Sequence, residues 1–180
     1  MSPKKIKIAI DMDEVLAKFN KKLMHEFSQR YKDDLLNLQL KANNASHLMI
    51  ELNEKVEEII FEPTFFQYLE VMENSQSVVR ELNHRFDVYI ATAAMYVPTC
   101  FGAKYEWLIT HFPFLDPMKF VFCGEKSIIH ADYLIDDHVN QLEVFQGTGL
   151  LFTSSHNMKE VGYKRINNWL EISDFFKNLE

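Results

Sequence analysis

The stretch KIKIAIDMDE, residues 5–14, constrains the fold more than any other part of the sequence. Residues 6–10 form an apolar run with only Lys7 as a charged interruption, which is typical of a strand buried on both faces of a parallel sheet. Asp11 and Asp13 follow directly. Because ligands of open α/β sheets bind outside the carboxyl ends of the strands, we expect both carboxylates at a functional edge. Solvated turn carboxylates are the alternative.

The stretch after this strand reads as helical. Apolar residues recur at three- and four-residue steps, which predicts an amphipathic helix over Leu16, Phe19, Leu23, Phe27 and Tyr31. A second helix is predicted to begin at about Ser46, interpreted as its cap, and to end at Glu62-Pro63. The segment KANNAS, residues 41–46, is predicted to be a loop between them. No convincing buried strand occurs between about residues 17 and 72.

Beyond residue 72, strand and helix patterns alternate. The predicted elements are a helix at 75–84, a strand at 87–93, a helix at 102–112, strands at 119–124, 133–137 and 149–153, and a last helix over SDFFKNL capped by Ser173. Such alternation implies a doubly wound parallel α/β sheet. We therefore predict a core domain of residues 1–16 and 73–180, with residues 17–72 inserted after the first strand as a small helical cap.

Composition limits the partners. The chain has 180 residues, of which 47% are hydrophobic, so it can bury a core within one domain. Its formal net charge of -7 argues against binding long nucleic acids. The first apolar stretch is too short for a signal peptide, and no segment has the roughly 20 apolar residues that span a bilayer. Cys100 and Cys123 lack metal-ligand spacing and are interpreted as buried reduced thiols. Together with the absence of such segments, this predicts a cytoplasmic protein without membrane contact.

Polar residues stand at comparable places on several predicted strands. They lie at the carboxyl ends of these strands or just beyond: Asp11, Asp13, Thr92, Lys126, Asp136 and Asp137. In a parallel sheet such positions converge on one edge, so we expect a single site. No two histidines have the i, i+4 spacing of a zinc site on a helix, and His138 and His156 are interpreted as surface residues of loops.

Three acids near one another would repel unless a cation joined them. Mg²⁺ prefers oxygen ligands and keeps positions for water and phosphate, so Asp11 and Asp136 are predicted ligands. A carboxylate can also attack phosphorus and form an aspartyl phosphate. Asp13 would then protonate the leaving alkoxide and later deprotonate the attacking water. Asp137 has two interpretations: it orients the metal's waters or Lys126, or it caps the next helix.

The stretches DMDEVL, IATAAM and GEKSIIHADYLIDD together resemble the four motifs of the haloacid dehalogenase-like hydrolase superfamily, specifically its 5'(3')-deoxyribonucleotidase branch. The third stretch contains two of these motifs, one with Lys126 and one with Asp136 and Asp137. FEPTFFQYLEVM is similar to the segment by which that branch returns from its cap to its core, so the resemblance covers nearly the whole chain. It implies that Asp11 is the nucleophile and Asp13 the acid/base. It also implies that Mg²⁺ is held by Asp11, Asp136 and the backbone carbonyl of Asp13.

The resemblance also implies how substrate is held. Phosphate would be bound by Thr92, Lys126 and, because Ala93 stands where relatives can offer a serine, by the backbone amide of that residue. An apolar pocket for sugar and base would be formed by Phe65 and Phe66, with Phe19. Superfamily members often have glycine after the DxD pair, whereas Glu14 stands here.

The expected function is Mg²⁺-dependent dephosphorylation of small nucleotides, that is, (deoxy)ribonucleoside monophosphates. Hydrolysis of another phosphometabolite such as a sugar phosphate is an alternative within the same class. A receiver-like phosphoacceptor module and a non-catalytic binding protein are alternatives from other classes. The inserted segment and Asp13, which would hydrolyse the phosphoryl group, oppose the receiver. Apolar helical stripes can bury within one chain or between two, so a homodimer is left open.

Overall fold

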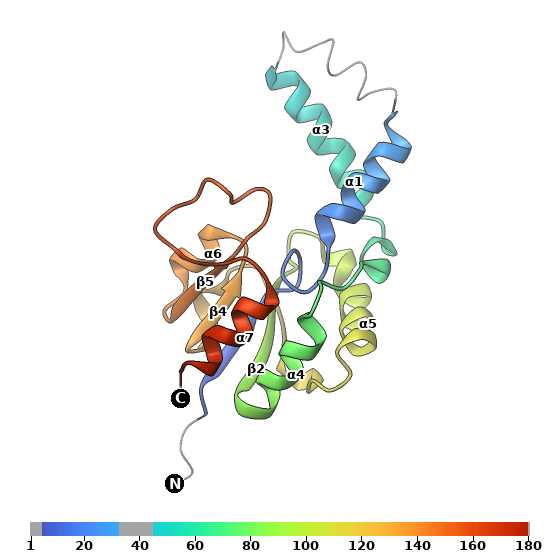
Figure 1. Ribbon diagram of the computed structural model, residues 1–180. Coiled ribbons are helices and arrows are strands. Elements are labelled where there is room, and N and C mark those ends of the chain that lie inside the picture. The colour runs from blue at the N-terminus through green and yellow to red at the C-terminus, as the bar shows by residue number, and fades with distance from the viewer. Residues whose placement is uncertain (1–4, 33–44, 180) are drawn as a thin grey trace.

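The computed structural model describes residues 5–32 and 45–179 (Figure 1). Within these residues it contains a six-stranded sheet in the order β3-β2-β1-β4-β5-β6, and every pair of neighbouring strands is parallel. The strands are β1 (Lys7–Ile10), β2 (Asp87–Ala93), β3 (Phe120–Cys123), β4 (Tyr133–Asp136), β5 (Thr148–Phe152) and β6 (Lys164–Ile166). The predicted strand at 6–10 thus becomes β1, next to the centre of the sheet.

Side-chain alternation along the strands divides the core into two layers. Ile8 and Ile10 pack with residues of α4 (Ser75–Arg85), α5 (Phe101–His111) and α7 (Trp169–Lys177) in the larger cluster. Ala9 points to the opposite face and packs with Leu142 of α6 (Val139–Val144). Because helices cover both faces of a parallel sheet, the predicted doubly wound α/β architecture is confirmed.

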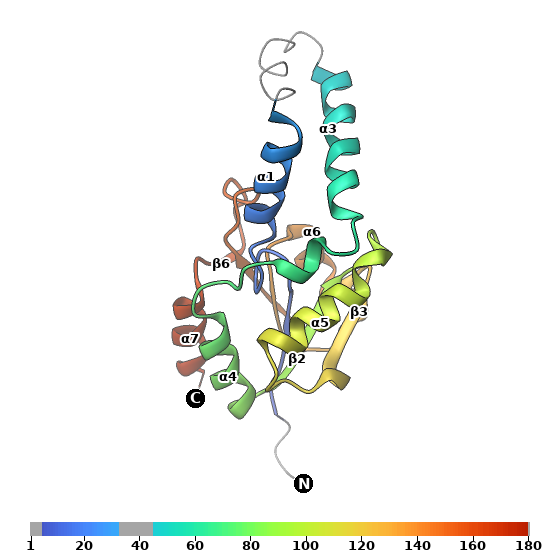
Figure 2. The ribbon, with the colours of Figure 1, turned by 90° about the vertical axis from the view of Figure 1, so that its right-hand side faces the viewer.

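Two helices project from this core. Figures 1 and 2 show α1 (Phe19–Arg30) and α3 (Ala45–Ile60) extending away from the sheet side by side. Arg30 donates to Glu62 at 2.5 and 2.9 Å, and the Tyr31 hydroxyl donates to Glu58, so polar pairs join the two arms of this projection.

At the base of the projection, the outgoing and returning chains pair. Ala17 and Val71 form an antiparallel bridge, the Lys18 amide donates to the Glu70 carbonyl at 2.8 Å, and the Met72 amide donates to the Leu16 carbonyl at 2.7 Å. In the described part of the chain, four short 3₁₀ helices complete the connections: η1 (Phe65–Tyr68), η2 (Pro98–Cys100), η3 (Pro117–Lys119) and η4 (Lys126–Ile128). This pairing agrees with an insertion at residues 17–72, although those boundaries stay a prediction.

Several predicted element ends are wrong. The last helix begins at Trp169 and is capped by Asn168, whose side-chain oxygen accepts from the Leu170 and Glu171 amides at 3.0 Å each. Ser173 is therefore not the cap; it lies inside the helix, where its hydroxyl donates to Glu81 at 3.3 Å. The prediction failed because a serine before two apolar residues gives the same local sequence signal in two cases: when it caps a helix, and when it lies within the buried face of a helix.

Other ends also shifted, and one strand was missed. Leu16 precedes α1 and lies in a turn, where its amide donates to the Met12 carbonyl at 2.8 Å. Ser46 lies inside α3 rather than before it, and the predicted loop at 41–46 falls mostly outside the described residues. Strand β6 was not predicted because its three residues, KRI, contain a single apolar side chain.

Candidate active site

The predicted polar residues meet at the carboxyl edge of the four strands β3, β2, β1 and β4. Asp11 follows β1, Thr92 and Ala93 end β2, Asp136 ends β4, and Lys126 begins η4 just after β3. One carboxylate oxygen from each of Asp11, Asp136 and Asp137 lies within 4.8 Å of the others. The expected convergence of these side chains is therefore observed.

Lys126 lies at the centre of this acidic group. Its ammonium donates to Asp11 Oδ1 and to Asp136 Oδ2, each at 2.5 Å, and its side chain is 1% exposed. Burial alone would lower the pKa of Lys126, but the two carboxylates outweigh burial and raise the pKa above its usual value. The lysine is therefore a buried cation that joins two acids.

The two aspartates after β4 differ in their hydrogen bonds. Asp136 accepts from Lys126 and from the His138 amide, so both of its oxygens have partners. Asp137 is 1% exposed, and neither of its oxygens has a hydrogen-bond partner among the described residues. The interpretation of Asp137 as a helix cap is therefore wrong: α6 receives no side-chain cap hydrogen bond, and the Asp137 carboxylate faces the site.

Burial and mutual repulsion shift the pKa values of these acids upward. Burial, followed by the charge of Asp11, raises the pKa of Asp136 to about 6. Burial and the charges of Asp11, Asp136 and Asp13 raise the pKa of Asp137 to about 9. Without a further cation the edge therefore retains protons that solvated carboxylates would lose.

Asp13 is held by Lys104, a residue that sequence reasoning missed. The Lys104 ammonium donates to Asp13 Oδ2 at 2.5 Å and to the Thr92 hydroxyl at 2.9 Å, and its side chain is 1% exposed. Burial raises the pKa of Asp13, an effect that Lys104 opposes and Asp11 adds to. Lys104 was overlooked because lysines of amphipathic helices normally face solvent.

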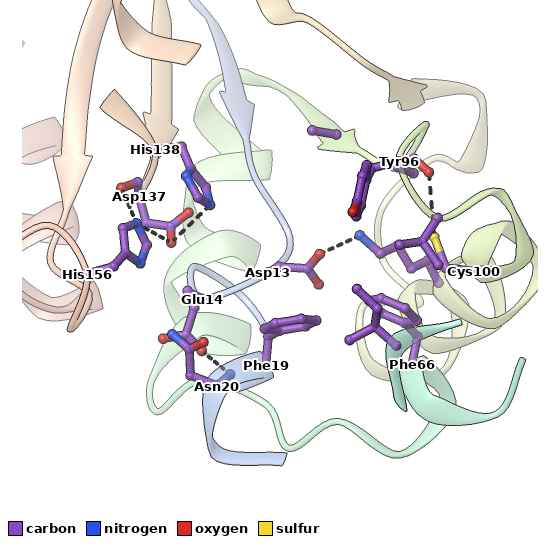
Figure 3. A pocket seen from close by; sticks show the side chains of 15 residues that line it. Asp13, Glu14, Phe19, Asn20, Phe66, Tyr96, Cys100, Asp137, His138 and His156 are labelled. Atoms are coloured by element: carbon purple, nitrogen blue, oxygen red, sulfur yellow. Dashed lines mark hydrogen bonds and ion pairs between the residues drawn. The ribbon is translucent and has the colours of Figure 1, made fainter. Parts of the chain in front are cut away.

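A cavity of about 320 Å³ opens beside Asp13 (Figure 3). Phe19 and Phe66 line it together with Lys104, Ala93 and Tyr96. A second cavity of about 460 Å³ lies on the other side of Asp13 and is lined by the acidic group, including Asp11, Lys126 and Asp136. Asp13 and Ala93 line both cavities, so an apolar pocket adjoins a charged one.

The three predicted pocket phenylalanines form one aromatic cluster. The ring centroids of Phe65 and Phe66 lie 5.1 Å apart, and those of Phe19 and Phe65 lie 5.4 Å apart. Phe65 does not line the cavity, and its ring packs between the other two and Lys22. Phe19 and Phe66 thus present the cluster to the cavity, while Phe65 supports them from behind.

Glu14 adopts a backbone conformation that suits glycine better than a residue with a side chain. Its φ of 57° lies in the left-handed region, which is unfavourable for a residue with a Cβ. Its carboxylate accepts from the Asn20 amide at 2.7 Å and from the Ser154 hydroxyl at 3.2 Å. Side-chain hydrogen bonds therefore hold the turn that glycine would adopt without strain.

His138 and His156 were interpreted as surface residues, and that placement is incomplete. Their side chains are 60% and 40% exposed, yet both line the cavity and stack with ring centroids 4.6 Å apart. Each ring turns a nitrogen toward Asp137, as Figure 3 shows. Two separate loops bring them together, so no spacing in the sequence could have paired them.

The donor set fits a hard divalent cation. Asp11, Asp136 and Asp137 supply carboxylate oxygens at one point, and the Asp137 oxygens are buried without a hydrogen-bond partner in residues 5–32 and 45–179. Such oxygens carry a large desolvation cost that a bound cation would offset. The chain's own residues are therefore compatible with Mg²⁺ at this edge.

Solved structures share this fold. A haloacid dehalogenase-like family hydrolase from Streptococcus pneumoniae aligns with a TM-score of 0.61 at 11% identity, covering 98% of this chain and all of the other. A HAD-hydrolase from Bacillus subtilis, solved bound to magnesium, aligns with a TM-score of 0.59 at 13% identity, covering 96% and 98%. The chain thus has the haloacid dehalogenase-like fold.

The sequence comparisons identify the family. The sequence model of the protein family described as "5' nucleotidase, deoxy (Pyrimidine), cytosolic type C protein" matches residues 4–179. The chain therefore belongs to this family. A Staphylococcus epidermidis protein named "Putative 5'(3')-deoxyribonucleotidase" is 47% identical over 174 residues, covering 97% of each chain. A 5'(3')-deoxyribonucleotidase of Bacillus subtilis is 37% identical over 173 residues, covering 92% and 95%. The chain is thus a hydrolase of the nucleotidase type.

None of the helices in the described part of the chain could cross a membrane.

Proposed function

We propose that the protein removes phosphate from deoxyribonucleoside monophosphates through a phosphorylated Asp11, with Mg²⁺ as cofactor. The observation that supports this most directly is the pairing of two adjacent acids with separate lysines. Asp11 is bound to Lys126, and Asp13 to Lys104. Different partners let two carboxylates that are close in sequence take different roles.

In the first step, the Asp11 carboxylate attacks phosphorus while Asp13 donates a proton to the leaving alkoxide. The raised pKa of Asp13 favours the protonated form that this step needs. In the second step, Asp13 accepts a proton from water, which attacks the phosphorylated Asp11 and releases phosphate. Lys104 stabilises the ionised form of Asp13 that results from the first step.

The groups at the sheet edge are proposed to bind the phosphate and the metal ion. Thr92, Lys126 and the Ala93 amide are proposed to contact its oxygens. Asp11, Asp136, Asp137 and the Asp13 carbonyl would hold Mg²⁺, which when bound offsets the negative charge that gathers on the transferring phosphoryl group. Asp137 joins the predicted ligands because its oxygens have no other partner in the described chain.

The apolar cavity is proposed to hold sugar and base. Its volume of about 320 Å³ lies at the lower end of the range of small-molecule sites. Phe19 and Phe66 offer aromatic surface at one wall, where a base could pack. We propose that residues 17–72 act as the cap that sets substrate choice, since Phe19, Ile60 and Phe66 all come from this segment. A cytoplasmic location and the oligomeric state stay predictions.

The test is phosphate release from ribo- and deoxyribonucleoside monophosphates and sugar phosphates, with Mg²⁺ or with EDTA. Wild type is compared with Asp11→Asn and with Asp174→Asn, a matched substitution at an exposed residue of α7. We expect Mg²⁺-dependent release that is strongest on deoxyribonucleotides and falls at least a hundredfold in Asp11→Asn only. Preference for sugar phosphates would discard the nucleotide pocket, and full activity of Asp11→Asn would discard the mechanism.

A further inference from the structure

A second cluster of metal-binding side chains lies beside the acidic group. Asp137 Oδ2 is 3.5 Å from His156 Nε2 and 4.0 Å from His138 Nε2. One atom from each of the three residues lies within 4.8 Å of the others. Ligand atoms of a tetrahedral zinc site lie about 3.3 Å apart, because Zn–N and Zn–O bonds are about 2.0 to 2.2 Å. The cluster is therefore close to the size that such an ion requires.

Hydrogen bonds fix which nitrogen of His156 faces Asp137. The Ser154 hydroxyl has one hydrogen, which it donates to Glu14 at 3.2 Å. His156 Nδ1 lies 3.1 Å from the same hydroxyl oxygen, and Nε2 donates to the Asp137 carbonyl, which can only accept, at 3.1 Å. A metal ion would replace the proton of Nε2, and the ring is oriented by the partner of the other nitrogen, as in established metal sites.

His156 Nε2 faces two oxygen atoms of Asp137. The Asp137 carbonyl oxygen lies 3.1 Å away and Asp137 Oδ2 lies 3.5 Å away. The Asp137 carboxylate is 1% exposed and has no hydrogen-bond partner among the described residues. His138 stacks on His156 and turns its own Nε2 toward the same oxygen. One oxygen and two nitrogens that can bind a metal thus lie around one point, next to a buried carboxylate whose charge a bound cation would neutralise.

We propose that Asp137, His138 and His156 form a second cation site, distinct from the acidic site proposed for Mg²⁺, which binds a borderline transition metal such as Zn²⁺. Two imidazoles and one carboxylate suit Zn²⁺ and leave a fourth position open, whereas Mg²⁺ prefers oxygen ligands alone. The exposed side of both rings gives the ion access from the cavity. Asp137 belongs to both clusters, so its carboxylate would connect the two sites.

The proposal is tested by titrating the full-length protein with Zn²⁺ in a calorimeter in the presence of excess Mg²⁺. We expect about one equivalent of Zn²⁺ to bind, and we expect His138→Ala and His156→Ala each to weaken binding at least tenfold. His84→Ala, which removes an exposed histidine of α4, should leave the affinity unchanged. Absence of Zn²⁺ binding under Mg²⁺, or equal affinity in both site variants and wild type, would overturn the proposal.

Two further measurements keep this test decisive. Visible absorption of the Co²⁺ form should show tetrahedral coordination without a thiolate charge-transfer band, and such a band would move the ion to Cys100 or Cys123. Thermal unfolding in EDTA confirms that each variant is folded before titration. Since calorimetry needs no substrate, a negative result would leave the proposed phosphatase activity untouched, and an inactive enzyme could still bind Zn²⁺ here.

Discussion

The raised pKa of Asp137 makes the stability of the metal-free protein depend on pH. In the unfolded chain the pKa of this carboxyl is about 3.9, whereas in the folded protein it is about 9. Between these values the folded state binds one more proton than the unfolded state. Stability is therefore lost as pH rises, by up to about 1.4 kcal/mol per pH unit.

Replacing Asp137 with asparagine removes this linkage, because an amide does not titrate. Between about pH 6 and pH 8 in EDTA, wild type should lose roughly 2 to 3 kcal/mol more unfolding free energy than Asp137→Asn. For a chain of this length that difference corresponds to about 5 to 10 °C in Tm.

The assay is thermal unfolding, followed by circular dichroism, of wild type, Asp137→Asn and the exposed control Asp174→Asn. The control should follow the wild-type pH dependence. Mg²⁺ should stabilise wild type more at the higher pH, since a ligand carboxyl must lose its proton to bind metal, and it should stabilise Asp137→Asn much less. Parallel pH curves for wild type and Asp137→Asn in EDTA would refute the reasoning, because the buried carboxyl would then carry no excess proton.

Three further substitutions probe the lysines and the aromatic pocket. Lys104→Met should raise the pKa of Asp13 further, because it removes the nearest positive charge, and should move the alkaline limb of the kcat/KM profile on nucleotides to higher pH. Lys119→Met, which removes the partner of Asp87 at the other end of β2, should not. Lys126→Met should cost about 3 to 5 kcal/mol in urea unfolding with EDTA, and a loss under about 1 kcal/mol would contradict the buried ion pairs. Phe66→Ala should lower kcat/KM at least tenfold more on nucleotides than on p-nitrophenyl phosphate, and equal losses would indicate packing alone.

The acidic edge could be predicted because strand ends carry a strong signal. A buried strand followed by Asp11 needs no knowledge of distant residues, and parallel topology brings Thr92 and Asp136 to the same edge. The order of the strands was not needed for this argument. The hydrogen-bond partners of Asp136 and Asp137 could not be predicted, because they depend on side-chain directions that the sequence does not give.

Lys104 shows what the sequence contained but local reasoning missed. It stands one turn from Cys100 and Leu108, and next to Ala103, all of which are buried. A lysine inside an apolar stripe is unusual and indicates a buried partner of opposite charge. That signal was available, although it could not say which of the acids Lys104 would meet. The histidine pair gave no such signal, because β4 and β5 had to be neighbours before their loops could meet.

Glu14 links the turn after β1 to the surroundings of the site. A left-handed conformation costs a residue with a Cβ about 1 to 2 kcal/mol, and glycine would avoid that cost. Glycine, however, has no carboxylate to accept from the Asn20 amide in the first turn of α1, where Lys18 provides no side-chain cap. It would also remove the acceptor of the Ser154 hydroxyl, which fixes the ring of His156. The strain at Glu14 is thus offset by contacts that position both α1 and the histidine pair.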